Sequence, residues 1–195
     1  MDGVKVKKYL FRIMISLLLL PILQGCVPII AAGVGTGAIL AQDRRSAGTV
    51  IDDKTDELAI SQNISKELKK KASISVTVYD HKVLLTGVAI NTNVKIKAGE
   101  IAQSRPGIKA VYNQVRLAVA SGLVRDASDS VITSMVKARM INQKGLNAEH
   151  VKVVTDDHIV YLMGIVTQQE ANLAAQCAST TEGVSKVITL FEYMN

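Results

Sequence analysis

The chain holds few residues whose types and spacing could carry out chemistry. Its three histidines are His81, His150 and His158, and its two cysteines are Cys26 and Cys177. No His-x-x-x-His, Cys-x-x-Cys, Gly-x-Ser-x-Gly or phosphate-cradling glycine loop occurs in the sequence. His81 and His158 could share a metal only if two separate turns met. Catalysis needs a nucleophile, a base or a metal ligand within reach of its partners, so we predict no enzyme, no metal site and no bound cofactor.

Cys26 follows a segment built like an export signal. An apolar run, Ile13 to Leu20, is followed shortly by Leu23-Gln-Gly-Cys26. Four basic residues precede the run: Lys5, Lys7, Lys8 and Arg12. Leu-x-Gly-Cys resembles the lipobox of bacterial lipoproteins. That resemblance implies a signal peptide at 1–25, cleavage before Cys26, a diacylglyceryl group on its thiol and an N-acyl chain such as palmitate. Two or three acyl chains anchor a protein stably, whereas one adds only about 0.8 kcal/mol per buried methylene.

An uncleaved transmembrane anchor is the alternative, because the weakly polar run from Val27 to Ala41 could lengthen the span. Pro21, Pro28 and the glycines that follow disfavour one continuous helix there. By resemblance to the sorting of such lipoproteins, Val27 rather than Asp after the cysteine indicates the outer membrane. We therefore expect a lipid-anchored protein on the periplasmic face of the outer membrane, with 26–45 as lipidated N-terminus and flexible tether.

The composition narrows the possible partners. The net charge is +6, but the signal contains four basic residues and one acidic residue, which leaves +3 for residues 26–195. The chain has no Trp and only two Phe, so it lacks an aromatic and basic platform for nucleic acid. No small-molecule substrate is indicated. Once Cys26 is acylated, Cys177 has no intramolecular partner, and its Ala-rich surroundings predict a small buried hydrophobe.

The rest of the chain contains an internal repeat. Lys82-Val-Leu-Leu-Thr-Gly87 aligns with Ile159-Val-Tyr-Leu-Met-Gly164 at a constant offset of 77 residues. At the same offset Ser75-Val-Thr-Val-Tyr79 aligns with Lys152-Val-Val-Thr-Asp156. We infer two copies of one unit.

Each copy has the same predicted order of elements. A helix begins near acidic or Ser/Asp residues, taken as caps (Asp52, Asp53 and Asp56; Ser128 and Asp129). Two strands joined by a polar turn follow, then a second helix and a last strand, Val111 to Val119 or Val184 to Tyr193. The order αββαβ predicts an α+β fold: a three-stranded mixed sheet with two helices on one face, at 46–119 and 125–195. Units this small are marginal alone, so contact between the copies is expected.

These features carry a family resemblance. The αββαβ repeat, the strand endings Val83-Leu-Leu-Thr-Gly87 and Tyr161-Leu-Met-Gly164, and a Gly-x-x-x-Val before each last strand resemble BON domains. With Arg45-Ser-Ala-Gly-Thr-Val-Ile-Asp-Asp53 after a lipobox, the chain is similar to dual BON-domain outer-membrane lipoproteins of the DolP type. The resemblance implies a non-enzymatic periplasmic protein that binds anionic phospholipid and supports cell-envelope integrity. It places the lipid-contacting surface on the first helix of the second domain, here Ser128 to Ile141.

That helix can be judged on its own residues. The spacing of Ile132, Val136 and Met140 predicts one stripe packed on the sheet. Val131 and Met135 lie on a neighbouring apolar flank that the core does not require. Cations beside it could reach phosphates, as in an interfacial helix. The predicted phospholipid-binding residues are Ser128, Val131, Ile132, Met135, Lys137, Ala138 and Arg139.

Two alternative roles for the flank remain open: it could pack against the other repeat, or it could belong to the core of its own domain. The relatives tend to carry an aromatic residue at the position of Val131, whose smaller side chain inserts less apolar area. In the first copy, acidic residues at the start of the helix would repel anionic headgroups, although Lys69-Lys70-Lys71 keeps its far end in consideration. The alternative function is a protein-interaction adaptor for the outer-membrane assembly machinery. A third hypothesis is that the function of the protein depends on its lipid anchor alone.

Overall fold

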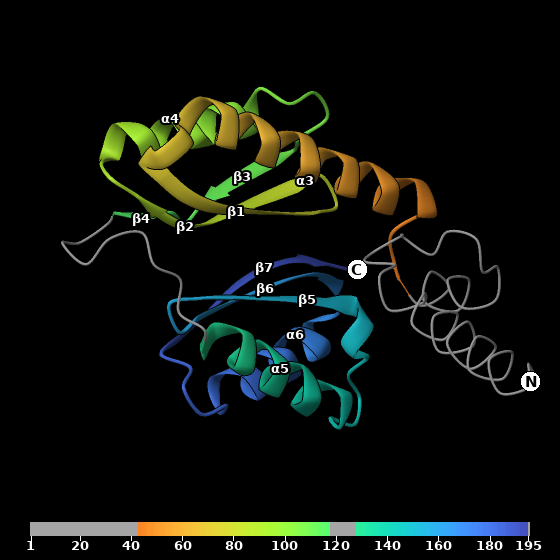
Figure 1. The fold of residues 1–195 in the computed structure, drawn as a ribbon. Coiled ribbons are helices and arrows are strands. Elements are labelled where there is room, and N and C mark those ends of the chain that lie inside the picture. The colour runs from red at the N-terminus through yellow and green to blue at the C-terminus, as the bar shows by residue number, and fades with distance from the viewer. Residues whose placement is uncertain (1–42, 118–127, 195) are drawn as a thin grey trace, which may run out of the picture. The chain divides into compact units, whose positions relative to one another are not determined.

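The computed structural model describes residues 43–117 and 128–194 (Figure 1). The predicted signal peptide, Cys26, the tether up to residue 42 and the connection around 119–126 lie outside the described residues. The described residues all belong to one compact unit.

The first repeat folds as a helix, a hairpin, a second helix and a returning strand. Its elements are α3 (Ala47–Leu68), η2 (Lys69–Lys71), β1 (Ala72–Tyr79), β2 (Lys82–Ala89), α4 (Thr92–Gln103), β3 (Ala110–Asn113) and β4 (Arg116–Leu117). Strand β1 pairs antiparallel with β2, and β3 and β4 pair parallel with β2 in one register, Val83 with Val111 and Val88 with Arg116. β3 and β4 thus occupy the place of the single last strand expected from the sequence.

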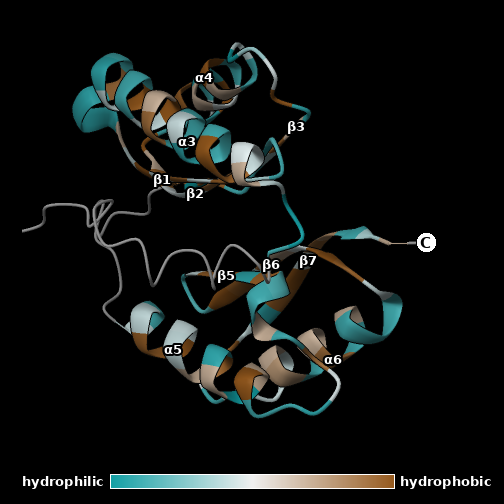
Figure 2. Cartoon of the chain, turned by 90° about the vertical axis from the view of Figure 1, so that its right-hand side faces the viewer, coloured by the Kyte–Doolittle hydropathy of each residue, from teal (hydrophilic) through white to brown (hydrophobic). Residues whose placement is uncertain are grey.

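The second repeat has the same order. It consists of α5 (Ser128–Ile141), η3 (Ala148–His150), β5 (Val151–Asp156), β6 (Ile159–Val166), α6 (Gln168–Ser179) and β7 (Lys186–Tyr193). The sheet order is β5-β6-β7, with an antiparallel and a parallel pair. In both repeats the two helices cover one face of their sheet, and their apolar residues turn toward it (Figure 2). The predicted α+β fold with two αββαβ units is confirmed.

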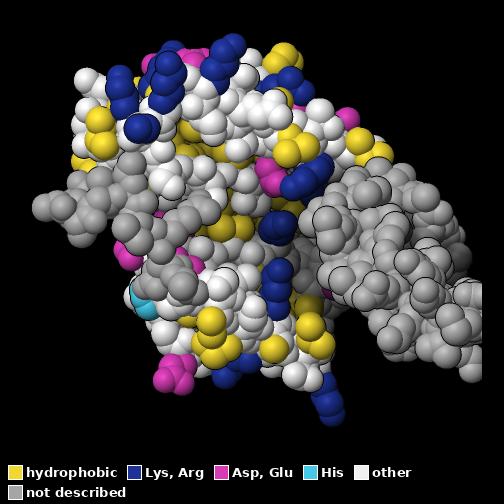
Figure 3. All heavy atoms as spheres, in the orientation of Figure 1, with side chains coloured by type: hydrophobic (Ala, Val, Ile, Leu, Met, Phe, Trp, Pro, Cys, Tyr) yellow, Lys and Arg dark blue, Asp and Glu magenta, His cyan; other side chains and the backbone are white. Residues whose placement is uncertain are grey.

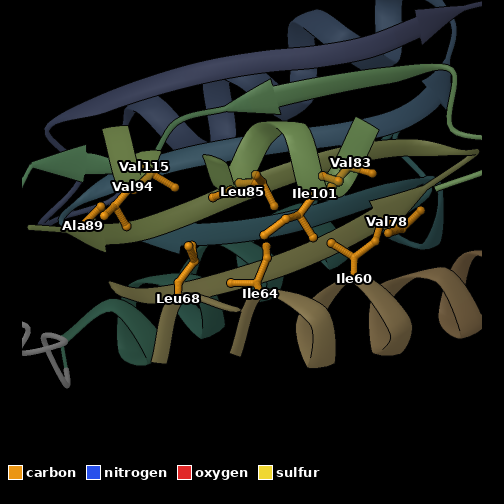
Figure 4. Close-up of a cluster of buried hydrophobic side chains, with 12 residues drawn as sticks. Ile60, Ile64, Leu68, Val78, Val83, Leu85, Ala89, Val94, Ile101 and Val115 are labelled. Atoms are coloured by element: carbon orange, nitrogen blue, oxygen red, sulfur yellow. The ribbon is translucent and has the colours of Figure 1, made fainter. Parts of the chain in front are cut away.

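Alternation along the strands separates three buried clusters. In β2, Val83 and Leu85 join the helix-facing core of the first domain (Figure 4), while Leu84 belongs to a different cluster. That cluster links the sheets of both repeats through Tyr79, Leu84, Tyr161 and Met163. The buried carboxylate of Asp156 accepts hydrogen bonds from the Gly87 backbone (3.2 Å) and from Arg116 Nε (3.3 Å). Contact between the copies, expected from their small size, is therefore made by the sheets.

The glycine that ends each aligned strand motif is required by a close backbone approach. A Cβ atom at Gly164 would lie 2.3 Å from the carbonyl oxygen of His150, and one at Gly87 would lie 2.1 Å from that of Ser73. Gly87 also has a φ of +107°, which side chains rarely adopt. The repeated glycines therefore let the neighbouring backbone pass close by.

The acidic residues expected to cap the first helices have another role. Helix α3 begins earlier than expected, at Ala47 with Ser46 as its cap, so Asp52, Asp53 and Asp56 lie within it. The carboxylate of Asp53 accepts the backbone N–H groups of Asp80 (2.7 Å) and His81 (2.8 Å) in the hairpin turn. The sequence prediction of a capping role was therefore wrong for Asp53.

The second repeat uses Asp129 in the same way, for the N–H groups of Asp157 (2.8 Å) and His158 (3.0 Å). Both residues of each turn have positive φ, as a two-residue type I′ hairpin demands. Neither turn contains the usual glycine. The charge-assisted hydrogen bonds to the aspartate offset the conformational cost of the turn.

Candidate functional site: the exposed face of helix α5

One face of α5 is fixed in the core of the second domain. Val136 and Met140 are fully buried there, and Ile132 is only 3% exposed. The predicted packing stripe is confirmed. Ile132 was also predicted to bind phospholipid, and that is wrong because its side chain is turned into the protein. The hydroxyl of Ser128 is likewise buried, so it does not face a headgroup.

The opposite face of α5 is apolar and uncovered by the described residues. Val131 is 57% exposed and Met135 36%, and Ala138 is exposed one turn beyond Met135 on the same side of the helix. Ile141, which the sequence prediction omitted, is 69% exposed one turn beyond Ala138. A strict helical count from Ala138 would have included it. The alternatives of plain core and interdomain packing therefore do not hold for this flank.

Two cations border this apolar face. At 100° per residue, Lys137 and Arg139 fall on opposite sides of the line from Val131 to Ala138. Arg139 donates to Thr180 Oγ1 at the end of α6 (2.6 Å), which fixes its position. Lys137 lines a pocket of about 260 Å³ together with Lys152 and Arg45, beside Ile141. The face thus combines apolar side chains with basic groups at its edges, as interfacial helices do.

The equivalent helix of the first repeat has different residues at these positions. Asp53 and Asp129 have the same role in their hairpins, which aligns α3 with α5 at an offset of 76 residues. At that offset Thr55, Ala59 and Gln62 replace Val131, Met135 and Ala138. Helix α3 does expose Ile51 (66%) and Leu58 (53%), but not at the positions equivalent to Val131, Met135 and Ala138. That set of three side chains is therefore a property of the second copy and is not needed to build the fold.

The segment that leads to the predicted anchor is fastened to both repeats. Arg44 forms a two-pronged ion pair with Glu170, with Nη1 to Oε2 at 2.7 Å and Nη2 to Oε1 at 3.0 Å. Arg45 pairs with Asp53 (2.7 Å) and lies over the ring of Tyr79. The sequence assigned Arg44 and Arg45 to a flexible tether. No local pattern could reveal partners 126 residues away.

Glu170 is the centre of a buried polar cluster. Besides Arg44, it accepts hydrogen bonds from the backbone and hydroxyl of Thr167, and it lies 2.9 Å from His150 Nδ1. Burial alone would raise the pKa of this carboxyl group. The hydrogen bonds from Arg44, Thr167 and His150 outweigh that effect and lower the pKa to about 2.

The other residues considered for chemistry are placed as follows. His158 Nδ1 lies 2.8 Å from the carbonyl oxygen of Gly183, and His81 Nδ1 lies 3.9 Å from Asp53. Within 43–117 and 128–194, no group of three metal-ligating side chains occurs. Cys177 is buried in the core of the second domain, as predicted. No helix in the described part of the chain has the length and apolarity to cross a membrane.

Comparison with known proteins identifies the class to which this fold belongs. The family described as BON domain matches residues 52–119 and again 128–195. The chain therefore belongs to the BON-domain family and carries two copies of the domain, which confirms the resemblance seen in the sequence. The BON-domain match and the names of the relatives point to a non-catalytic family.

The similarity extends over nearly the whole chain in relatives of known name. The chain is 36% identical to outer membrane lipoprotein DolP of Haemophilus influenzae, over 89% of this chain and 91% of that one. It is 35% identical to a 21 kDa hemolysin of Actinobacillus pleuropneumoniae, covering 78% and 79% of the two chains. It is 27% identical to osmotically-inducible protein Y of Escherichia coli K12, covering 81% and 89%. The expected outer-membrane location is confirmed by this kinship.

Proposed function

We propose that the protein is lipid-anchored through Cys26 and binds anionic phospholipid of the outer membrane through helix α5 of its second BON domain, supporting the integrity of the envelope. The observation that carries the proposal is the exposed apolar face of Val131, Met135 and Ala138 between Lys137 and Arg139. The covalent acyl chains on Cys26 are part of the proposal. No enzymatic step is involved.

The physical basis is a two-part interaction. Val131, Met135 and Ile141 would enter the acyl-chain boundary, and full burial of a side chain of this size contributes about 1.5 to 3 kcal/mol. Lys137 and Arg139 would remain at the level of the phosphates, where a basic residue adds about 1 kcal/mol near an anionic surface. Such a site is weak by itself. The anchor compensates by keeping the domain at the membrane, which raises the local lipid concentration.

The test is vesicle binding by the unlipidated fragment 42–195, which contains all three buried clusters and is expected to fold. We expect it to sediment with vesicles rich in phosphatidylglycerol or cardiolipin and to bind phosphatidylcholine vesicles less. Val131→Glu should lower the binding constant at least about ten-fold, because an apolar contact becomes an anion. Thr55→Glu, at the matching exposed position of α3, is the control and should change binding little. No binding by the fragment, or equal effects of both variants, would contradict the proposal.

The adaptor function makes a different prediction for the same face. A photoreactive residue at Met135, introduced into the full lipoprotein in cells, should form adducts with lipid if α5 contacts the membrane. Protein adducts at that position would instead support docking to an envelope protein. If anchoring alone mattered, Cys26→Ser would abolish function while Val131→Glu and Met135→Glu left it intact.

A further inference from the structure

The first domain concentrates positive charge at the end where α3 meets β1. Five exposed lysines gather there: Lys66, Lys69, Lys70, Lys71 and Lys97. Two glutamates accompany them, with Lys97 Nζ at 4.0 Å from Glu67 and 3.4 Å from Glu100. The excess of three charges equals the net charge of residues 26–195. Figure 3 shows basic side chains gathered over this end of the domain. We name these five residues the lysine end.

The lysine end surrounds exposed aliphatic surface. Ile90, directly after β2, is 49% exposed and lines a shallow pocket of about 360 Å³ together with Lys71 and Lys97. Ile96, on the neighbouring surface of α4, is 52% exposed. The remaining walls of the pocket are mostly polar, with Asn91 and Asn93 among them. Cationic side chains beside exposed isoleucines match the make-up of an interfacial membrane site.

The fold itself does not require these lysines. In the second repeat, the segment between helix α5 and η3 is Asn142-Gln-Lys-Gly-Leu-Asn147, with one lysine. A glycine, Gly145, takes the positive φ of +83° in that segment. In the first repeat Lys69 adopts a φ of +47°, which is costly for a residue with a side chain. Lys69, an exposed cation, thus occupies a backbone conformation that favours glycine.

We infer that the lysine end is a second membrane-binding surface, which contacts the anionic headgroups of a lipid bilayer through the first domain. The lysines are spread around the end of the domain and do not converge on one small pocket, so they fit an extended array of phosphates better than a single anion. The exposed Ile90 and Ile96 fit the apolar boundary below such an array. This surface is independent of α5, because it shares no residue with it.

Binding of the fragment 42–195 to vesicles of equal parts phosphatidylglycerol and phosphatidylcholine tests the inference. Each lysine near an anionic surface contributes about five-fold to binding, so Lys70→Gln/Lys71→Gln should lower the binding constant about 25-fold at low salt. The effect should fade at high salt, where the charges are screened. Lys109→Gln/Lys186→Gln removes the same charge where strands β3 and β7 begin, and it should leave binding nearly unchanged. Equal losses in the two variants would overturn the inference, as would an unchanged constant in the first.

A second variant separates binding from folding. Lys69→Gly removes a cation and relieves the positive φ, so it should weaken vesicle binding while leaving the thermal unfolding temperature equal or higher. A loss of both would show a merely structural role and overturn the inference. Failure of this surface can be distinguished from failure of the α5 surface by combining the two sets of substitutions. In the Val131→Glu fragment, Lys70→Gln/Lys71→Gln should still reduce residual binding, and no further reduction there would also count against a second surface.

Discussion

Acid should weaken this protein in a way that depends on Glu170. Its carboxylate is 10% exposed and accepts five hydrogen bonds, two from Arg44, two from Thr167 and one from His150 when that ring nitrogen carries the proton. The pKa of the group is about 2 in the folded chain, against an ordinary 4.5. Ionised Glu170 therefore contributes up to about 3 kcal/mol to the free energy of unfolding at neutral pH.

The sign follows from the lowered pKa. The contribution is complete above pH 4.5, where the unfolded chain is also ionised, and it is lost as the pH falls toward 2. Glu170→Gln preserves the shape of the side chain but removes its charge. The fragment 42–195 with this change should therefore be less stable than the unchanged fragment at pH 7, by about 2 to 3 kcal/mol.

Urea unfolding followed by circular dichroism measures this difference at several pH values. The gap between the two fragments should narrow steadily below pH 4.5, while carboxylates common to both cancel. Glu182→Gln, at an exposed position, controls for the loss of any one acidic side chain. A gap that stayed constant from pH 7 to pH 3 would refute the assignment of the stabilisation to the ionised carboxylate of Glu170.

Three further outcomes follow from the described contacts. Gly164→Ala should lower the free energy of unfolding by about 1 to 3 kcal/mol, because the added Cβ would clash with the backbone. Gly87→Ala should lower it more, because Gly87 also has a positive φ; thermal unfolding of the two variants measures the difference. Asp129→Ala should cost about 1 to 3 kcal/mol and speed amide exchange in the hairpin turn that it binds; unchanged exchange would contradict this. Burial raises the pKa of the Cys177 thiol, so thiol reagents at pH 7 should modify it slowly until urea unfolds the chain.

The sequence was most informative where structure depends on local pattern. Strand alternation and the repeated Gly87 and Gly164 gave the αββαβ unit twice, because each copy must bury one face of a sheet. The stripe of Ile132, Val136 and Met140 followed from helical spacing. Helical spacing places a residue on one face of a helix but does not decide its function. Ile132 was therefore predicted both as a core residue and as a phospholipid-binding residue.

What escaped prediction depends on pairs distant in the sequence. Asp53 looks like a helix cap because acidic residues favour helix starts, yet the hairpin turn 27 residues later binds its carboxylate. Arg44 looks like linker because its partner, Glu170, belongs to the other repeat. Neither role is encoded in neighbouring residues. Both become visible only when the turn and the second domain are in place.

The two repeats share an aspartate and a glycine that the fold requires, and they differ in several residues that face outward. Each copy keeps the aspartate that binds its hairpin turn and the glycine that allows a close backbone approach. Both copies therefore still meet the same structural requirements at these positions. Yet α5 has Val131 and Met135 where α3 has Thr55 and Ala59, and the first copy has Lys69 where the second has Gly145. A duplication kept only for stability would not need a different exposed surface on each copy. Divergence at these exposed positions is what two separate contacts with a membrane would require.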